Sequence, residues 1–344
     1  MNYRTLLSRH RSAIMGVAAV LIVFFHAEWK AAPGILGLLA REGQAGVDLF
    51  VFLTGFGLAH SLAKRPAPEA YWARRLRRLL PAYYVWLAVM TLIALGLMAL
   101  RLRQGDFLHW LLLHLFPVGV WLNHQPQVWY VSAALGYCAL APMFDVLLTR
   151  ARHLRVAAVL MVLGTGVVLP SVWGMGDVEL ALIRVPGLVV GLAVGIAARR
   201  EDGQSAGLAC LAALAVLGLC LPRGANLPLL RDIQAKELHR LTLNLLAPAL
   251  AVALAFLFEG LEKLRLTIPA RAFGALGRVS LESYLAHVVL SGLVRDTLRL
   301  PGPAVLMILL AACWPLAWLM ARAASRLLAL WDRFSAAFRR PAAP

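Results

Sequence analysis

Apolar segments long enough to cross a lipid bilayer recur along almost the whole chain. We count about ten, each of roughly 20 residues, which is the length that a helix needs to span the hydrocarbon core. Hydrophobic residues make up 61% of the chain and charged residues only 15%. This composition predicts an all-α, polytopic transmembrane helical bundle, with residues 1 to 344 as a single domain, and excludes a soluble globular protein. The expected spans are approximately 13 to 30, 43 to 60, 80 to 100, 128 to 148, 154 to 173, 181 to 198, 205 to 221, 241 to 258, 274 to 294 and 303 to 323.

The positions of lysine and arginine predict the orientation of the spans. The chain holds 34 of these residues, and if the N-terminus is cytoplasmic, about two thirds of them fall on the cytoplasmic side, as is usual for membrane proteins. Both termini are therefore predicted to be cytoplasmic, in a multi-pass protein of the cell inner membrane. The net charge of +17 is distributed in short clusters between apolar spans, which argues against a nucleic-acid partner.

Two ionisable side chains interrupt the first two apolar spans. His26 lies near the end of span one and Asp48 about one turn into span two. An ionisable group at bilayer depth is costly and suggests a functional site. Because span one would run outward and span two inward, the two side chains lie at a similar depth and could meet. Alternatively, His26 bonds only water or backbone, and Asp48 forms a structural pair with Arg41 or Lys30.

Span nine carries further polar side chains. Ser280, Glu282 and Ser283 lie toward its cytoplasmic end, and His287 lies past the midplane. A continuous row of polar groups through the bundle would give these side chains, and His26, hydrogen-bond partners. His287 could instead form only a hydrogen bond across a helix interface.

A basic segment at 71 to 86, YWARRLRRLLPAYYVW, lies in the predicted cytoplasmic loop before span three. Arg75 and Arg78 are three residues apart and hence share a helical face. Two guanidinium groups can hold a phosphate-rich ligand through paired hydrogen bonds. Setting topology or binding anionic headgroups of membrane lipids would explain the same arginines. Pro81 is expected to mark the start of span three.

No metal site is predicted. The cysteines lie inside apolar spans without the spacing of metal ligands, and we interpret them as packing residues: Cys138, Cys210, Cys220 and Cys313. A polar cluster in the outer loop between spans three and four could line an acceptor site, hold a metal without a recognisable spacing, or be a solvated loop: His109, His114, Asn123 and His124.

Five sequence segments, in order, resemble motifs of the acyltransferase type 3 family of integral membrane acyltransferases. VFFH ends the first span, GVDLFVFLTGF opens the second, and RRLRRLLPAYY precedes the third; WYVS and SLESYLAH follow in spans four and nine. At Met15, eleven residues before His26, the family usually has arginine, and Arg11 lies one turn earlier on the same face. The family also often has a glutamate shortly after the fourth motif, where this chain reads AALGY.

The resemblance implies transfer of an acyl group, by default acetyl, from cytoplasmic acyl-CoA to an extracytoplasmic or lipid-linked glycan, without a metal. It suggests His26 as general base toward a sugar hydroxyl and Asp48 as its orienting partner; His26 could also carry the acyl group covalently. Arg75 and Arg78 would bind the CoA phosphates. Candidates for positioning the acceptor or polarising the thioester are Trp129, Tyr130, Ser132, Ser280, Tyr284 and His287.

One structural role and two other functions fit some of these residues. Trp129 and Tyr130 could simply form an aromatic belt at the outer membrane surface. Buried ionisable residues also mark the translocation path of transporters and lipid-linked glycan flippases, but paired repeats with broken helices are not visible in this sequence. A third possibility is a catalytically silent relative that binds acyl-CoA, because Met15 and AALGY depart from the family pattern.

Overall fold

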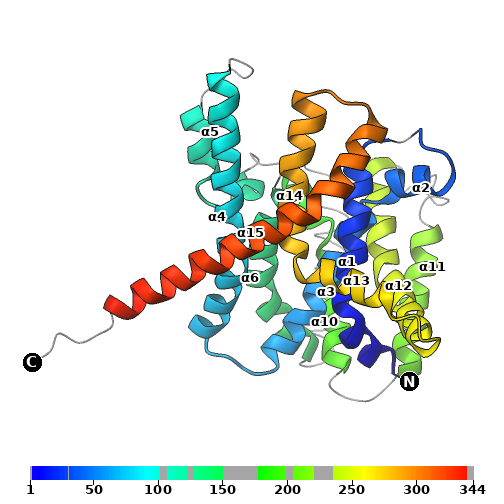
Figure 1. Ribbon diagram of the computed structural model, residues 1–344. Helices are drawn as coiled ribbons and strands as arrows, with labels where there is room; N and C mark the ends of the chain where they lie inside the picture. Colours follow the sequence, from blue (N-terminus) through cyan, green and yellow to red (C-terminus); the bar gives the residue numbers. More distant parts are fainter. Residues whose placement is uncertain are drawn as a thin grey trace, which may run out of the picture.

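A computed structural model describes residues 2–29, 31–100, 107–122, 128–149, 177–198, 204–220 and 235–338. Every regular element in these ranges is helical, which confirms the predicted all-α class (Figure 1). The α-helices are α1 (Tyr3–His26), α2 (Gly34–Glu42), α3 (Ala45–Leu62), α4 (Pro68–Ala99), α5 (Phe107–His114), α6 (Trp129–Thr149), α9 (Asp177–Leu182), α10 (Val185–Ala198), α11 (Gln204–Cys220), α12 (Ala235–Lys263), α13 (Ile268–Arg278), α14 (Ser280–Ser291) and α15 (Gly302–Phe338). A 3₁₀ turn, η1 (Gly119–Leu122), precedes α6, and a π-helical segment, η3 (Gly292–Thr297), follows α14.

Within the described ranges, seven helical segments are long and apolar enough to cross a membrane. They match seven of the expected spans, and are Tyr3–His26, Ala45–Leu62, Pro68–Ala99, Trp129–Thr149, Asp177–Ala198, Leu238–Lys263 and Gly302–Ser335. The expected span at 205 to 221 corresponds to α11, whose apolar part is shorter, at Leu211–Cys220. The span at 154 to 173, together with Asn123 and His124, lies outside the described residues.

The structure corrects the prediction of a single span at 274 to 294. The helix breaks at Val279, where the backbone leaves the helical region, and α13 and α14 lie on either side. The segment before the break packs closely on α1: a side chain at Gly277 would overlap the carbonyl oxygen of Ser12, and one at Gly16 would overlap that of Phe273. Helix α13 therefore lies directly on the backbone of α1, while α14 turns into the bundle.

The basic segment at 71 to 86 is helical and not a loop. Helix α4 runs without interruption through Pro81, because a proline inside a membrane helix removes a single backbone donor that the surrounding structure can compensate. Pro81 therefore lies inside a helix that begins at Pro68, and whether it marks the point where the chain enters the membrane stays a prediction. The prediction that Arg75 and Arg78 share a helical face is confirmed, since both line one cavity.

Helices α3 and α10 form the most closely packed pair in the centre of the bundle. A side chain at Gly55 would overlap the carbonyl oxygen of Leu188, and one at Gly191 would overlap that of Phe52. Small residues of this kind let helix backbones approach in a membrane, where dispersion forces rather than water exclusion hold helices together. This contact fixes the position of α3, which carries Asp48 and Thr54.

We expect Gly55→Ala to lower the free energy of unfolding by about 1–3 kcal/mol, because the new methyl group must push α3 and α10 apart. Reversible unfolding by sodium dodecyl sulfate in mixed micelles would measure the change. Gly96→Ala in α4 is the matched control, because no heavy atom lies within 4 Å of the position that its Cβ would take. Equal stability of the two variants would contradict this packing of α3 against α10.

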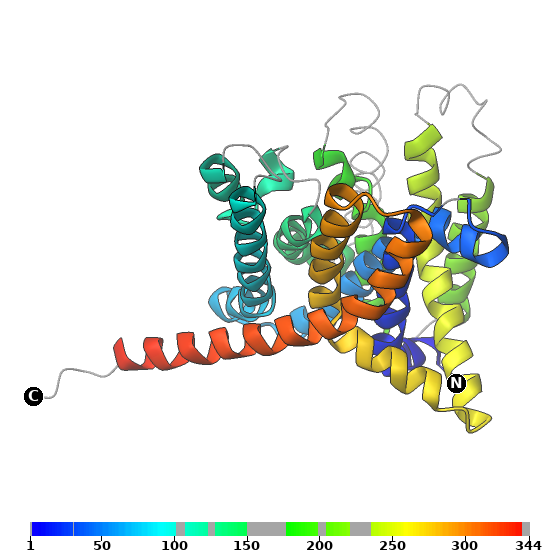
Figure 2. The same cartoon turned by 45° about the horizontal axis from the view of Figure 1, so that its top comes forward.

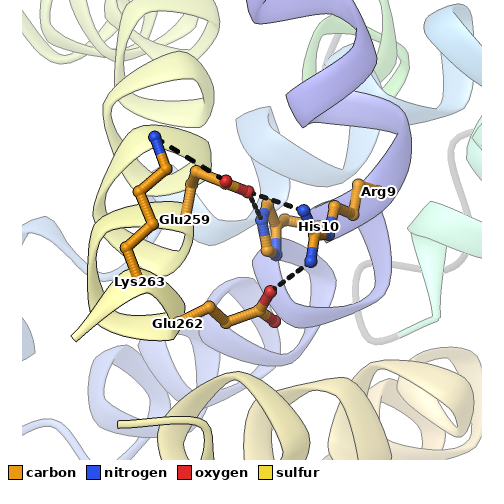
Figure 3. A network of polar contacts seen from close by, with 5 residues as sticks. All are labelled: Arg9, His10, Glu259, Glu262 and Lys263. Carbon is orange, nitrogen blue, oxygen red and sulfur yellow. Dashed lines mark hydrogen bonds and ion pairs between the residues drawn. The ribbon is translucent and has the colours of Figure 1, made fainter. Parts of the chain in front are cut away.

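An ion-pair network fastens the start of α1 to the end of α12 (Figure 3). Arg9 donates to Glu259 at 3.0 Å and to Glu262 at 2.7 Å. His10 Nε2 lies 3.3 Å from the same Glu259 oxygen, and Lys263 Nζ lies 3.9 Å from the other. The network marks the end of the bundle that holds the N-terminus, which we call the N-terminal end.

Candidate functional site

A cavity of about 180 Å³ lies between α1, α3, α4, α6 and α14, and one of its lining residues, Arg11, directly follows His10 of the network at the N-terminal end. Three of its lining residues are arginines, Arg11, Arg75 and Arg78. The deeper wall is formed by apolar and hydroxyl-bearing side chains: Met15, Phe50, Thr54, Tyr130, Ser280 and Tyr284. Ligand pockets for whole drug-sized molecules usually occupy about 300–1,000 Å³. The cavity is therefore suited to the end of a larger anionic ligand.

The arginines reach the cavity from two helices. Arg78 donates to Glu282 of α14 at 2.8 Å, and its side chain remains 50% exposed. The guanidinium group of Arg75 lies over the ring of Tyr71, 5.3 Å from the centroid. Arg11 donates to the carbonyl oxygen of Leu53 at 3.2 Å. Three cations with one carboxylate beside them make a positive site, which favours a phosphate-bearing ligand.

Two tyrosines close the inner end of the cavity. The hydroxyl groups of Tyr130 and Thr54 are 3.3 Å apart, and the backbone N–H of Tyr130 donates to the Tyr284 hydroxyl at 3.4 Å. The rings of Tyr130 and Tyr284 are 5.4 Å apart between centroids. Tyr284 and Ser280 lie on one face of α14, because they are four residues apart. The structure thus brings five predicted site residues to one cavity: Arg75, Arg78, Tyr130, Ser280 and Tyr284.

His26 and His287 form a pair beyond Tyr284. Their ring centroids are 4.6 Å apart, and the ring of His287 lies 5.2 Å from that of Tyr284. His287 is 1% exposed, and neither of its ring nitrogens has a hydrogen-bond partner. An ion pair of 2.7 Å between Arg295 in η3 and Glu28 joins the ends of α1 and α14 next to the two histidines. Buried nitrogens without partners are costly, so this pair is able to bind a further polar group.

The structure corrects the expected pairing of His26 with Asp48. Asp48 is 1% exposed, and its carboxylate accepts a hydrogen bond of 3.1 Å from Asn244 and lies 3.2 Å from Arg184 Nε. Gly46 of α3 packs on α1 at Ala18. Asp48 is two residues further along α3, so it lies beside the middle of α1 and not beside the end of α1, where His26 lies. Asp48 joins α3 to the turn between α9 and α10 and to α12, while His26 has His287 as its neighbour.

Trp129 and Ser132 are buried but do not line the cavity. The guanidinium group of Arg184 lies over the ring of Trp129, 4.9 Å from the centroid. Ser132 is fully buried, its hydroxyl has no hydrogen-bond partner, and its carbonyl oxygen accepts from Trp121 at 3.0 Å. Trp129 and Tyr130 are 9% and 8% exposed, so they do not form a lipid-facing aromatic belt.

Three residues of the site and its support escaped the sequence analysis: Thr54, Arg184 and Asn244. Arg184 lies inside an apolar span, and this position could have predicted an ion pair, because a buried arginine needs an anionic partner. Asn244 donates to Asp48 and accepts from the backbone N–H of Gly187 at 2.8 Å. Neither Thr54 nor Asn244 has a sequence context that separates it from an ordinary polar residue in a membrane helix.

Among the described residues, one group has the composition of a metal site, although no metal was predicted. The ligand atoms of His10, Glu259 and Glu262 lie within 4.8 Å of one another. Arg9 already binds both carboxylates, so a cation would have to displace its guanidinium group. The arrangement is that of an ion-pair network between helices, and none of its residues lines the cavity.

Comparison with known protein families identifies the family of the chain. The model of the acyltransferase type 3 family, described as an acyltransferase domain, matches residues 14–322. The match includes every residue that lines the cavity or belongs to the histidine pair, except Arg11. No match was found among curated proteins or among solved structures. Because the family match covers most of the 344 residues, the chain belongs to the acyltransferase type 3 family and is a multi-pass membrane acyltransferase.

Proposed function

We propose that the protein transfers an acyl group, most simply acetyl, from cytoplasmic acyl-CoA to a hydroxyl group of an extracytoplasmic or lipid-linked glycan. The observation that carries this proposal is the arrangement of α14. This helix presents Ser280 and Tyr284 to the basic cavity and, less than one turn further on, presents His287 to His26. One face of α14 would thus connect the acyl-CoA donor, held at the N-terminal end, with the general base His26, which lies deeper in the bundle.

The cavity would hold only part of the donor. The arginines offer paired hydrogen bonds to phosphate, so the nucleotide end of CoA would lie at the mouth of the cavity beside Arg75 and Arg78. The narrower acyl thioester end would then extend past Tyr130 and Tyr284. Their hydroxyl groups could polarise the thioester carbonyl and stabilise the negative charge that develops on its oxygen.

His26 would act as general base toward the acceptor. As the sugar oxygen attacks the thioester carbon, the imidazole takes the hydroxyl proton, the C–S bond breaks and CoA leaves as a thiolate that is then protonated. His287 is the neighbour that can orient His26 and share the imidazolium proton, the role that the sequence analysis gave to Asp48. Transient acylation of His26 itself would follow the same geometry in two steps.

The arginine assignment makes a prediction about donor binding. Replacing Arg75 and Arg78 together with glutamine is expected to raise the KM for acetyl-CoA by roughly 10-fold or more, because each lost charge-assisted hydrogen bond is worth about 1.5–3 kcal/mol. Arg74→Gln is the control, because Arg74 lies beside these residues but does not line the cavity. Steady-state transfer at varied acetyl-CoA would measure KM, and an unchanged KM in the double variant would refute the assignment.

Acyl transfer in proteoliposomes tests the function as a whole. Radiolabelled acetyl-CoA is supplied at the side that holds the N-terminus, with a lipid-linked oligosaccharide fraction from bacterial membranes as acceptor, and released CoA thiol is titrated in parallel. Label on the oligosaccharide supports direct transfer, and label retained on the protein supports an acyl-enzyme. Retained CoA binding without label or thiol release, for acetyl and longer donors alike, would contradict the proposal and indicate a catalytically silent relative.

A further inference from the structure

Helix α15 is longer than a membrane-spanning helix needs to be. It has 37 residues and is thus about 55 Å long, whereas the hydrocarbon core is only about 30 Å thick. Its first half packs on α14, where the thiol of Cys313 donates to the carbonyl oxygen of Ser283. Figures 1 and 2 both show the second half crossing α4 and continuing away from the other helices. Residues 323–338 also lie beyond the family match at 14–322, so the family assignment does not account for them.

Two uncharged runs show where α4 and α15 leave the membrane. Residues 79–99 of α4 and residues 302–321 of α15 contain no charged side chain, and each run is long enough to cross the hydrocarbon core. Arg78 directly precedes the first run, and Arg322 directly follows the second. The guanidinium group of Arg322 lies over the ring of Trp318, 5.5 Å from the centroid, and tryptophan and arginine are typical anchors at the membrane surface. The two arginines therefore mark the level at which each helix leaves the hydrocarbon.

An ion pair keeps the rest of α15 at this level. Both guanidinium Nη atoms of Arg77 donate to Asp332 at 2.6 Å, and Arg77 is next to Arg78 at the start of the uncharged run of α4. Asp332 is ten residues beyond Arg322. A helix that continued straight out of the membrane would carry Asp332 about 15 Å away from the surface and from Arg77. Residues 322–338, which we call the terminal segment, therefore run along the membrane surface.

One side of the terminal segment is apolar and uncovered. Leu330, Trp331 and Phe334 are 62%, 64% and 62% exposed, and Leu327 is 41% exposed. These four residues follow the i, i+3, i+4, i+7 spacing of a single helix face. Asp332 is two residues from both Leu330 and Phe334, which places it about 160° away from each around the helix. Helix α4, which binds Asp332, therefore leaves Leu330 and Phe334 open to the surroundings.

A row of arginines borders this apolar face. Arg326 and Arg333 lie four residues before and three residues after Leu330, so their side chains are neighbours of Leu330 on the helix surface. Arg322 lies one turn before Arg326 in the same row. The three arginines are exposed, and none has a carboxylate partner among the residues that the structure describes, because the single carboxylate of the terminal segment is bound to α4. Their positive charge is therefore available to a ligand beside the apolar face.

We propose that the terminal segment binds the surface of the bilayer at the N-terminal end as an interfacial helix, with its apolar face among the acyl chains and its arginines on the phosphates of anionic lipids. Basic residues beside an exposed apolar face are typical of this mode of binding. The long arginine side chains reach the headgroups while their methylene groups stay on the apolar surface. A second copy of the chain would have to supply carboxylates at this level, whereas lipid phosphates are already present there. The proposal is independent of the acyl-transfer reaction.

Quenching of tryptophan fluorescence by brominated lipids measures the depth of the terminal segment without an activity assay. The full chain is reconstituted in nanodiscs whose acyl chains carry bromine either near the carbonyl end or near the methyl end. The signal of Trp331 is the difference between wild type and Trp331→Phe. We expect bromine near the carbonyl end to quench this signal about 2-fold or more strongly than bromine near the methyl end, because an interfacial helix lies only about 5–10 Å deep.

Moving the tryptophan around the helix tests which face meets the lipid. In the Trp331→Phe background, Phe334→Trp should be quenched as strongly as Trp331 is in wild type, because both positions belong to the apolar face. Ser325→Trp is the matched control. Ser325 is exposed, but it lies nine residues before Phe334 and hence on the opposite side of the helix, so a tryptophan there should be quenched little.

The choice between lipid headgroups tests the role of the arginines. At the same low mole fraction, brominated phosphatidylglycerol should quench Trp331 roughly 3-fold or more strongly than brominated phosphatidylcholine, because arginines at the surface attract anionic headgroups. Arg326→Gln/Arg333→Gln should abolish this difference. Arg271→Gln/Arg278→Gln removes two exposed arginines of α13 instead and should leave the difference unchanged.

Circular dichroism and gel filtration establish that each variant is folded, and three results in folded protein would overturn the proposal. Equal quenching of Trp331 by the two lipids would show that the arginines hold no anionic headgroup. Equal quenching of tryptophans at positions 325 and 334 would show that the terminal segment has no lipid-facing side. A Trp331 signal that no brominated lipid quenches would place the segment in water or against a second copy of the chain.

Discussion

Replacing His26 with alanine is expected to lower acyl transfer by roughly 100-fold or more, the usual contribution of a positioned general base. The loss should appear in kcat, with the KM for acetyl-CoA little changed, because His26 is not among the residues that line the basic cavity. His287→Asn should cost less, because the neighbouring imidazole at 4.6 Å would orient His26 rather than take the proton. Initial rates of label transfer in proteoliposomes, corrected for the amount of folded protein, measure both effects.

His239→Ala is the matched control for loss of a histidine. The side chain of His239 in α12 is 42% exposed, lies 3.0 Å from Glu42 and does not line the cavity, so its replacement should leave transfer within about 2-fold of wild type, as is usual for surface substitutions. Label that accumulates on wild-type protein without acceptor, but not on His26→Ala, would identify His26 as an acyl carrier rather than a base. Wild-type kcat in folded His26→Ala would refute any catalytic role for this residue.

Breaking the Asp48–Arg184 pair is expected to have the largest effect on stability. Both side chains are nearly fully buried, and Arg184→Met would leave the Asp48 carboxylate without its cationic partner. Removing one member of a buried ion pair typically costs about 3–5 kcal/mol. Unfolding by sodium dodecyl sulfate in mixed micelles measures the loss.

The double variant Asp48→Leu/Arg184→Met tests whether the cost arises from the uncompensated charge. It should recover much of the stability lost in Arg184→Met, because two apolar side chains of similar volume need no charged partner. Asp48→Asn keeps an acceptor for the Asn244 amide and should transfer acyl groups at near wild-type rate per folded molecule. If Asp48→Asn lowers the rate of acyl transfer as much as His26→Ala does, Asp48 takes part in the reaction.

The sequence alone was sufficient where the information lies within one helix. Apolar length predicted the spanning helices, and the spacing of Arg75 and Arg78 predicted their shared face, because the rotation per residue is fixed by backbone geometry. The same rule aligns Ser280, Tyr284 and His287 along α14. The ordered motifs also identified the family correctly, since they depend on residue order and not on how the helices pack.

The tertiary structure decided which helices meet and at what level. The expected pair of His26 and Asp48 assumed that the ends of two adjacent spans lie level, but the contact of Gly46 with α1 sets a different register. Asp48 has two partners, Arg184 in the turn before α10 and Asn244 in α12. No local sequence spacing connects either of them to Asp48. The position of α13 on α1 likewise depends on Gly277 packing against the backbone at Ser12. Such contacts are non-local, because they depend on how closely small residues on different helices let the backbones approach, and only the assembled bundle determines that.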